Sequence, residues 1–167
     1  MAVGLARAFA SQKNTRVLLV DPSPGTSQLN RRLDSERVEA QGEKNGPPIP
    51  DADDNSTLLR AKKYNFDVLQ IKNARELDHN NFQEWIFRSH PFYEVIIVDA
   101  GPLQGDTPDK VKDISSYTML VIDASKTTEP MLERLSKVLS ASNFTIDGAI
   151  LNRRKFYIPK LLYGLVR

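Results

Sequence analysis

Four short apolar runs, each ending at an acidic or amide residue, constrain the fold of this chain most strongly. The runs span residues 17–20, 93–98, 119–122 and 146–151, and they end at Asp21, Asp99, Asp123 and Asn152. They are rich in β-branched residues without strict polar alternation, which is typical of strands covered on both faces of a parallel sheet. Segments with helical spacing separate them. The sequence therefore predicts an α/β fold with a doubly wound, mostly parallel sheet and helices on both faces.

The remaining elements follow from simpler patterns. Residues 66–71 alternate apolar and polar side chains, which predicts a strand nearer an edge of the sheet. Helices are predicted over residues 2–10, around 82–90 and from about 129 to 139. In the first helix we expect Leu5, Ala8 and Phe9 to be buried. Residues 34–57 are rich in glycine, proline and aspartate, which predicts a mobile surface loop.

Length and composition limit the classes of protein to consider. The 167 residues suit one domain, 1–167, and 40% hydrophobic with 26% charged residues is ordinary globular composition. A net charge of +2 gives no general case for nucleic acid, so no nucleic-acid partner is expected. The absence of cysteine excludes disulfides, zinc–thiolate sites, Fe–S clusters and cysteine nucleophiles. No apolar run approaches the roughly 20 residues that span a bilayer.

The polar residues that follow the strands are the candidate functional residues. In open α/β sheets, ligands bind beyond the carboxyl ends of the strands, where Asp21, Asp99, Asp123 and Asn152 are expected. Two carboxylates at that place suit Mg²⁺, which prefers oxygen ligands and retains several waters. Acidic residues also cap turns and helices there. For Asp21 and Asp99 the two interpretations stay open, whereas the turn-rich residues after Asp123 favour a cap.

Several segments together resemble one protein family. YEVIIVDAGPL resembles the Walker B segment of deviant P-loop ATPases, and VLLVDPSPGT stands where bacterial tyrosine kinases of capsule and exopolysaccharide export have an additional acidic motif. GAILNRRKFYIPKLLY resembles the end of that kinase domain, and MAVGLARAFASQKNTRVLLVD the helix and strand after its phosphate loop. The resemblance covers most of the chain except about residues 34–60 and implies a P-loop NTPase-like fold.

The resemblance implies a role for particular residues of this chain. Asp99 would hold Mg²⁺ through water, and Asp21 would lie opposite it. Asn152 would bind adenine through its amide, with Arg153 either stacking on or flanking the base or remaining a solvated surface charge. Pro102 would fix the loop after Asp99. The implied chemistry is MgATP binding and tyrosine autophosphorylation, so ATP and Mg²⁺ are the expected cofactors if this chain binds nucleotide at all.

Two departures from the family pattern bear on activity. Ser23 and Gly25 stand where the family has a second acidic residue and a basic one. No Gly-x-x-x-x-Gly-Lys-Ser/Thr motif occurs, so the phosphate loop and first strand of the family would lie upstream of Met1. A start codon placed at an internal methionine, a truncated chain and a degenerate homologue are three open explanations. We expect little or no kinase or ATPase activity from this chain alone, because that loop grips the phosphates.

The resemblance also implies partners and a location. The expected partner is a membrane chain-length or polysaccharide co-polymerase protein, and the expected location is cytoplasmic, with peripheral contact at the inner membrane. The missing strand would expose strand edges, which invites homo-oligomers. Residues 153–167 are basic and apolar without an acidic residue, which suits either an anionic membrane surface or a last helix packed on the sheet. A non-catalytic regulatory or scaffold protein and a partition- or division-site ATPase are the alternative functions.

Overall fold

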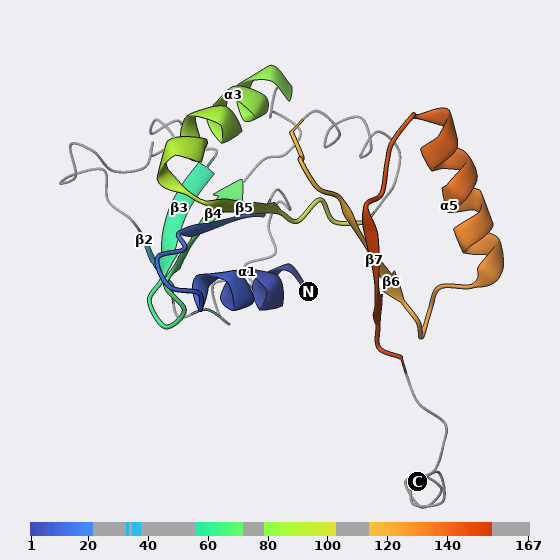
Figure 1. Ribbon diagram of the computed structural model, residues 1–167, viewed down its shortest axis with the longest axis horizontal. Coiled ribbons are helices and arrows are strands. Elements are labelled where there is room, and N and C mark those ends of the chain that lie inside the picture. Colours follow the sequence, from blue (N-terminus) through green and yellow to red (C-terminus); the bar gives the residue numbers. More distant parts are fainter. Residues whose placement is uncertain (22–32, 34, 38–55, 72–78, 103–113, 155–167) are drawn as a thin grey trace, which may run out of the picture. The chain divides into compact units, whose positions relative to one another are not determined.

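The computed structural model describes residues 1–21, 33, 35–37, 56–71, 79–102 and 114–154 (Figure 1). The chain divides into two compact units, Met1–Lys110 and Val111–Arg167, and each contains its own sheet. Most of the predicted loop 34–57 lies outside the described residues. The ends of that range belong to strands, since Ser35–Arg37 forms β2 and Ser56–Ala61 forms β3.

The first unit contains a five-stranded sheet in the order β2-β3-β4-β1-β5. Its parallel part consists of β4 (Phe66–Ile71), β1 (Val17–Asp21) and β5 (Val95–Val98). Strands β2 and β3 extend this part as antiparallel neighbours. The second unit pairs β6 (Met119–Asp123) with β7 (Gly148–Asn152) in parallel. The strands predicted from the four apolar runs are thus confirmed, and so is the α/β fold class with a mostly parallel sheet.

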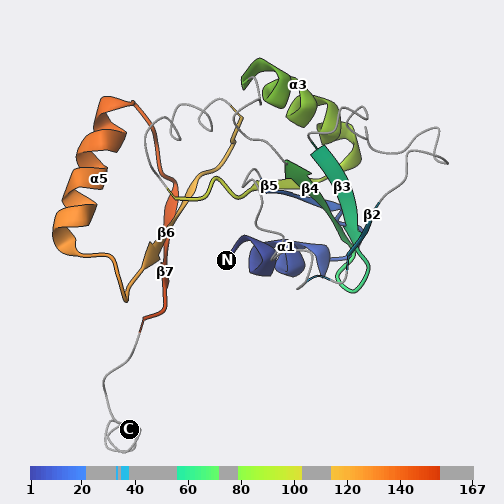
Figure 2. The same ribbon diagram turned by 180° about the vertical axis from the view of Figure 1, so that it is seen from behind.

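Helices cover both faces of the first sheet, as predicted. Helix α1 (Ala2–Ala10) and helix α3 (His79–Ser89), which continues into the 3₁₀ turn η1 (His90–Phe92), lie on opposite sides of it (Figures 1 and 2). The side chains of β1 point alternately toward α1 and toward α3. Val17 and Leu19 belong to the cluster that contains Ala6 of α1, whereas Leu18 and Val20 belong to the cluster that contains Ile86 of α3. These four apolar residues of β1 are at most 1% exposed, so β1 is the centre of the core.

The buried face of α1 differs from the predicted one. Ala6 is fully buried, whereas Leu5 is 37% exposed and Ala8 is exposed. Phe9 is half-buried against the same cluster as Ala6. The small side chain of Ala6 lets the helix backbone approach the strands closely, and the flanking apolar residues then pack around it.

Strand β4 lies inside the sheet, so the prediction that it is near an edge was wrong. It pairs with β1 on one side and with β3 on the other. The alternation in Phe66–Ile71 arises because its second residue, Asp67, is a buried acidic side chain with specific partners. Strand β3, which the sequence analysis did not identify, supplies one of those partners and covers the edge of β4.

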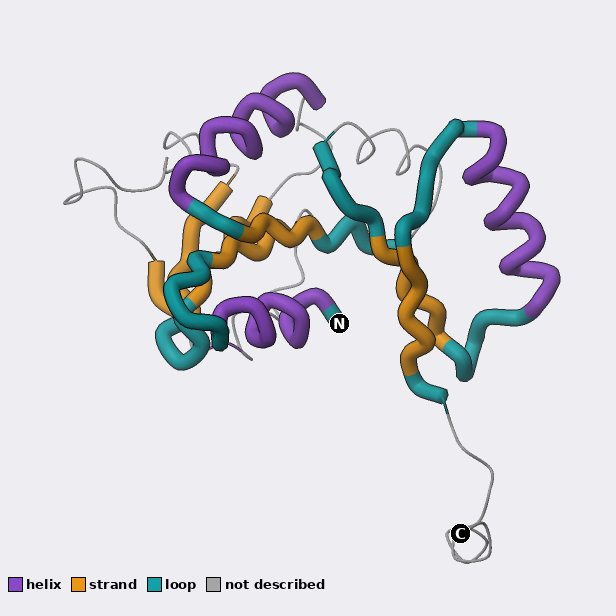
Figure 3. The backbone as a smooth tube through the Cα atoms, viewed as in Figure 1, coloured by secondary structure: helices purple, strands orange, loops and turns teal. Residues whose placement is uncertain are grey.

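The described part of the second unit contains β6, helix α5 (Glu129–Ala141) and β7 (Figure 3). Thr128 occupies the N-cap position of α5 with an extended backbone, and Pro130 lies in the first turn, where a missing N–H costs no helical hydrogen bond. No residue of α5 is buried, and Phe144 is the buried apolar residue of the described part of this unit. No helix among the described residues is long and apolar enough to cross a membrane.

Candidate nucleotide and metal site

Asp21 and Asp99 lie at the carboxyl ends of two neighbouring parallel strands. Val20 of β1 pairs with Val98 of β5, and each aspartate is the next residue along its strand. The backbone N–H of Asp99 donates a 2.9 Å hydrogen bond to the carbonyl oxygen of Val20, which ties the two ends together. Asp21 is buried and Asp99 is exposed. The structure therefore brings the predicted pair of carboxylates to the same end of the first sheet.

The loop after β5 is shaped by Asp99 itself. Its Oδ1 accepts a 3.2 Å hydrogen bond from the backbone N–H of Gly101, which closes an Asx-type turn. Gly101 has a φ of +70°, a conformation that glycine adopts without steric cost. Pro102 follows on the surface of the first unit. The Asp-x-x-Pro segment thus holds a defined turn that presents Asp99 to solvent.

The donor chemistry of this pair fits a hydrated magnesium ion in part. Carboxylate oxygens are the ligands that Mg²⁺ prefers, and the ion commonly keeps several of its waters. In the described part of the chain, however, no three His, Cys, Asp or Glu side chains converge to hold a metal. Asp21 and Asp99 would therefore bind Mg²⁺ through water and together with the phosphates of a nucleotide. The ion would supply charge neutralisation at those phosphates.

Asp123 caps the turn after β6, in agreement with the interpretation that the sequence favoured. Its Oδ1 accepts hydrogen bonds from the backbone N–H of Ser125 at 3.0 Å and from the Ser125 hydroxyl at 2.6 Å. The Ser125 hydroxyl is the main cause that lowers the pKa of the Asp123 carboxyl below its usual value, helped by the nearby charges of Arg153 and Lys126. Asp123 is therefore a structural carboxylate of the second unit.

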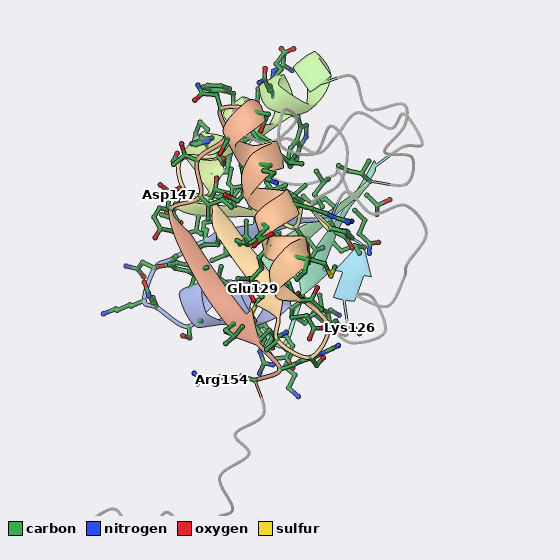
Figure 4. All side chains as sticks on the ribbon, turned by 90° about the vertical axis from the view of Figure 1, so that its right-hand side faces the viewer. Lys126, Glu129, Asp147 and Arg154 are labelled. Carbon is green, nitrogen blue, oxygen red and sulfur yellow. The ribbon has the colours of Figure 1, made fainter. Side chains whose placement is uncertain are left out.

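Arg153 forms an ion pair with the same carboxylate. Its Nη1 lies 3.0 Å from Oδ2 of Asp123, the residue opposite Asn152 in the β6–β7 register. The backbone of Arg153 has a φ of +56°, and its N–H donates a 3.0 Å hydrogen bond to the carboxamide oxygen of Asn152. Figure 4 shows that Lys126 and Arg154 lie at this end of the unit and Asp147 at the other. The predicted base-binding residues thus form a local network with Asp123.

The predicted site residues fall into two groups. Asp21, Asp99 and Pro102 belong to the first unit, and Asn152 and Arg153 belong to the second. Within each group the residues are neighbours at the carboxyl ends of parallel strands, where ligands bind in such sheets. The assignment of these residues to nucleotide and metal stays a prediction.

The sequence analysis missed a buried polar network at the other end of the first sheet. Asp67 of β4 is 5% exposed and accepts hydrogen bonds from Nε of Arg60 at 3.0 Å and from the hydroxyl of Tyr93 at 2.9 Å. Arg60 lies opposite Asp67 in the β3–β4 register. An aspartate within an otherwise apolar strand is the signal that could have revealed it, because a buried charge requires partners. The network is remote from the carboxyl ends of the strands.

Comparison with solved structures shows the fold. A crystal structure described as the VpsO kinase domain superposes with a TM-score of 0.64 and 22% sequence identity, over 92% of this chain and 77% of that domain. The two chains share a fold. No protein-family model and no curated protein matches the chain. The α/β fold with a mostly parallel sheet expected from the sequence is therefore confirmed.

Proposed function

We propose that this chain is a tyrosine-kinase-like, MgATP-type domain of a bacterial exopolysaccharide or capsule system, and that by itself it has little or no catalytic activity. The observation that carries the proposal is the pair Asp21 and Asp99, held side by side at the ends of β1 and β5 by the 2.9 Å bond from Asp99 N–H to Val20. Support comes from the Walker B-like segment around Asp99 and from the fold shared with the VpsO kinase domain.

The division of roles follows from the chemistry of each residue. Asp99, exposed and held by its turn, would orient a water of the Mg²⁺ shell, and Asp21 would add negative charge on the other side. Asn152 would contact the base through its amide group, with Arg153 beside it. ATP and Mg²⁺ are the proposed cofactors. Low activity follows because the sequence holds no glycine-rich loop with a lysine to position the terminal phosphates.

A regulatory or scaffold role is the second candidate function. It is favoured by the ion pair that engages Arg153, one of the predicted base-binding residues, within the second unit. In both versions the proposed partner is a membrane chain-length or polysaccharide co-polymerase protein, and the proposed location is the cytoplasmic side of the membrane. A partition- or division-site ATPase is less favoured, because the basic ending and the Asn152–Arg154 stretch resemble the exopolysaccharide branch.

Two assays test the proposal. The chain is incubated with MgATP and its five tyrosines are examined by mass spectrometry for phosphate, with Asp99→Ala as the variant and Asp147→Ala as a control outside the site. We expect unmodified tyrosines. Phosphotyrosine that disappears in Asp99→Ala would show an active kinase. In the second assay, a chain-length protein from the same genome, reconstituted in nanodiscs, is expected to bind the chain. A failure to bind would contradict the exopolysaccharide assignment.

A further inference from the structure

A groove on the first unit lies between helix α1 and the turn that joins β3 to β4 (Figures 1 and 2). Its volume is about 620 Å³, which is within the range of small-ligand sites. Arg7 stands on the helix side and Lys63 on the turn side. Among the described residues that line the groove, none is acidic. This lining therefore carries two positive charges and no negative one.

Tyr64 is fixed on the turn side of the groove. The backbone N–H groups of Tyr64 and Asn65 donate hydrogen bonds of 3.0 and 3.1 Å to the carbonyl oxygen of Ala61, which closes the turn. Asn65 has a φ of +53°, in the left-handed region that asparagine tolerates better than most residues. The Tyr64 ring stacks on that of Phe66 with centroids 6.2 Å apart, and Phe66 is buried in the same cluster as Ala6 of α1. The core thus holds the tyrosine ring in place.

The guanidinium group of Arg7 lies over the Tyr64 ring. Its Cζ is 4.1 Å from the ring centroid, and Nζ of Lys63 is 5.8 Å from the same centroid. An arginine has five N–H donors, so contact with one ring face leaves donors for an acceptor. The ring also restricts the side chain, which lowers the entropy lost when a ligand binds. In the part of the chain that the structure describes, no carboxylate forms an ion pair with Arg7 or Lys63.

We propose that this groove binds a phosphate monoester and that Arg7 and Lys63 hold its phosphate group. Such a group carries nearly two negative charges at neutral pH, which matches one forked and one point-like cation. A carboxylate carries a single charge and is matched by the arginine fork alone. The side chains of Ser11 and Asn65 also line the groove and add polar atoms to it.

The groove is separate from the candidate nucleotide site. It lies at the amino ends of β1 and β4, because the end of α1 leads into β1 and residues 63–65 lead into β4. Asp21 and Asp99 lie at the opposite, carboxyl ends of the parallel strands. The inference therefore does not depend on nucleotide binding and goes beyond the proposed function.

Arg7 also contributes to the helix itself. It is the basic residue of the last turn of α1, where a positive charge stabilises a helix. That effect needs only the charge, whereas phosphate binding uses the guanidinium fork. Arg7→Lys keeps the charge and removes the fork. We therefore expect this variant to leave the thermal midpoint of unfolding nearly unchanged and to weaken phosphate binding, a combination that a purely helical role would not produce.

The first experiment titrates the full chain with two soluble probes and follows the backbone amide signals by NMR. Glycerol 3-phosphate is a phosphate monoester, and glycerophosphoglycerol is a diester with a single negative charge. With the monoester we expect saturable changes in the millimolar range, centred on Arg7, Ser11 and residues 63–65. The diester is expected to bind more weakly, because it lacks the second charge.

Matched variants test whether the two cations hold the phosphate. Arg7→Lys and Lys63→Gln are each expected to weaken binding of the monoester roughly fivefold or more, about one hydrogen bond to a charged group. Lys13→Gln removes an exposed lysine outside the groove and should change binding by less than about twofold. Binding that both groove variants leave unchanged would overturn the proposal.

A second experiment tests whether the phosphate monoester is the headgroup of a lipid. The full chain is sedimented with vesicles that contain phosphatidic acid, a monoester, or phosphatidylglycerol, a diester, adjusted to equal surface charge. If a headgroup is the ligand, the native chain prefers phosphatidic acid and Arg7→Lys removes the preference, while the basic residues 153–167 contribute equally in both proteins. A preference for the monoester that depends on Arg7 supports the proposal in either experiment and identifies the source. No such preference in either experiment would overturn it.

Discussion

The hydroxyl of Tyr93 donates a 2.9 Å hydrogen bond to Oδ2 of Asp67, and both residues are only 5% exposed. The Asp67 carboxylate also accepts a bond from Arg60, whose side chain is 45% exposed. A buried carboxylate would be costly without such partners. The pair joins β4 to the segment that leads into β5, so it stabilises the parallel part of the first sheet.

Substitutions of Tyr93 and of Asp67 are both expected to destabilise the fold, and the substitution of Asp67 is expected to cost more. Tyr93→Phe keeps the ring and loses one bond to a charged group, so we expect a loss of about 1–2 kcal/mol in the free energy of unfolding. Asp67→Ala leaves the Tyr93 hydroxyl buried without its acceptor, and a loss of roughly 2–4 kcal/mol is expected. Urea unfolding measures both. The control is Arg88→Ala, which breaks the exposed pair with Glu84 and should cost only about 0.3–0.5 kcal/mol.

The same hydrogen bond predicts how stability changes at alkaline pH. Burial, and then the nearby Asp67 carboxylate, raise the pKa of Tyr93 well above its ordinary value of 10.0. Because the pKa of Tyr93 is higher in the folded than in the unfolded state, the protonated hydroxyl contributes fully to stability below about pH 10. This contribution to the free energy of unfolding is lost as the pH rises further. Unfolding followed from pH 8 to about 11 should show decreasing stability, and Tyr93→Phe should flatten this slope. An unchanged slope in the variant would contradict the assignment.

The cap at Asp123 makes a separate prediction in the second unit. The Ser125 hydroxyl is the first cause of the lowered pKa of Asp123. Ser125→Ala is therefore expected to move that pKa up toward its ordinary value, as read by NMR titration of the carboxyl carbon. Arg153→Gln should produce a smaller upward change, because the charge of Arg153 is a lesser cause. If Arg153→Gln had the larger effect, the ion pair and not the cap would control Asp123.

Residues 153–167 carry a prediction about membranes. They contain five basic and no acidic residues, so sedimentation with vesicles that contain phosphatidylserine should show binding that weakens with added salt. Deletion of residues 153–167 should abolish the binding, whereas Lys126→Gln, outside this segment, should retain most of it. If the deletion leaves binding unchanged, the segment has no role at the membrane.

Much of the fold was predictable because apolar strands and amphipathic helices leave local patterns. The four strands whose carboxyl ends carry Asp21, Asp99, Asp123 and Asn152, with Asp99 directly after its strand, were found in this way. So were the starts of the helices near Ala2 and Glu129. The position of β4 was not, since the alternation of Asp67 and Gln70 suits an edge strand equally well. Only the contacts of Asp67 with Arg60 and Tyr93 distinguish an interior strand from an edge strand. Tyr93 is distant from Asp67 in the sequence, and Arg60 lies on β3, which the sequence analysis did not identify.

The candidate site was predictable in part for the same reason. The register places Asp21 beside Asp99, as expected from the carboxyl ends of parallel strands. The ion pair between Arg153 and Asp123 was not foreseen, because the residues are 30 positions apart and either could have been a solvated charge. Sequence patterns locate such ends of strands, but they do not decide which side chains there bind one another.

The central claim is that the carboxylate and amide residues of a nucleotide site are present without a motif that binds the phosphates. Calorimetric titration of the chain with MgATP tests this claim most directly. We predict no saturable binding below millimolar concentration, both for the native chain and for Asp99→Ala. A micromolar dissociation constant for the native chain that is lost in Asp99→Ala would contradict the claim and show a functional nucleotide site.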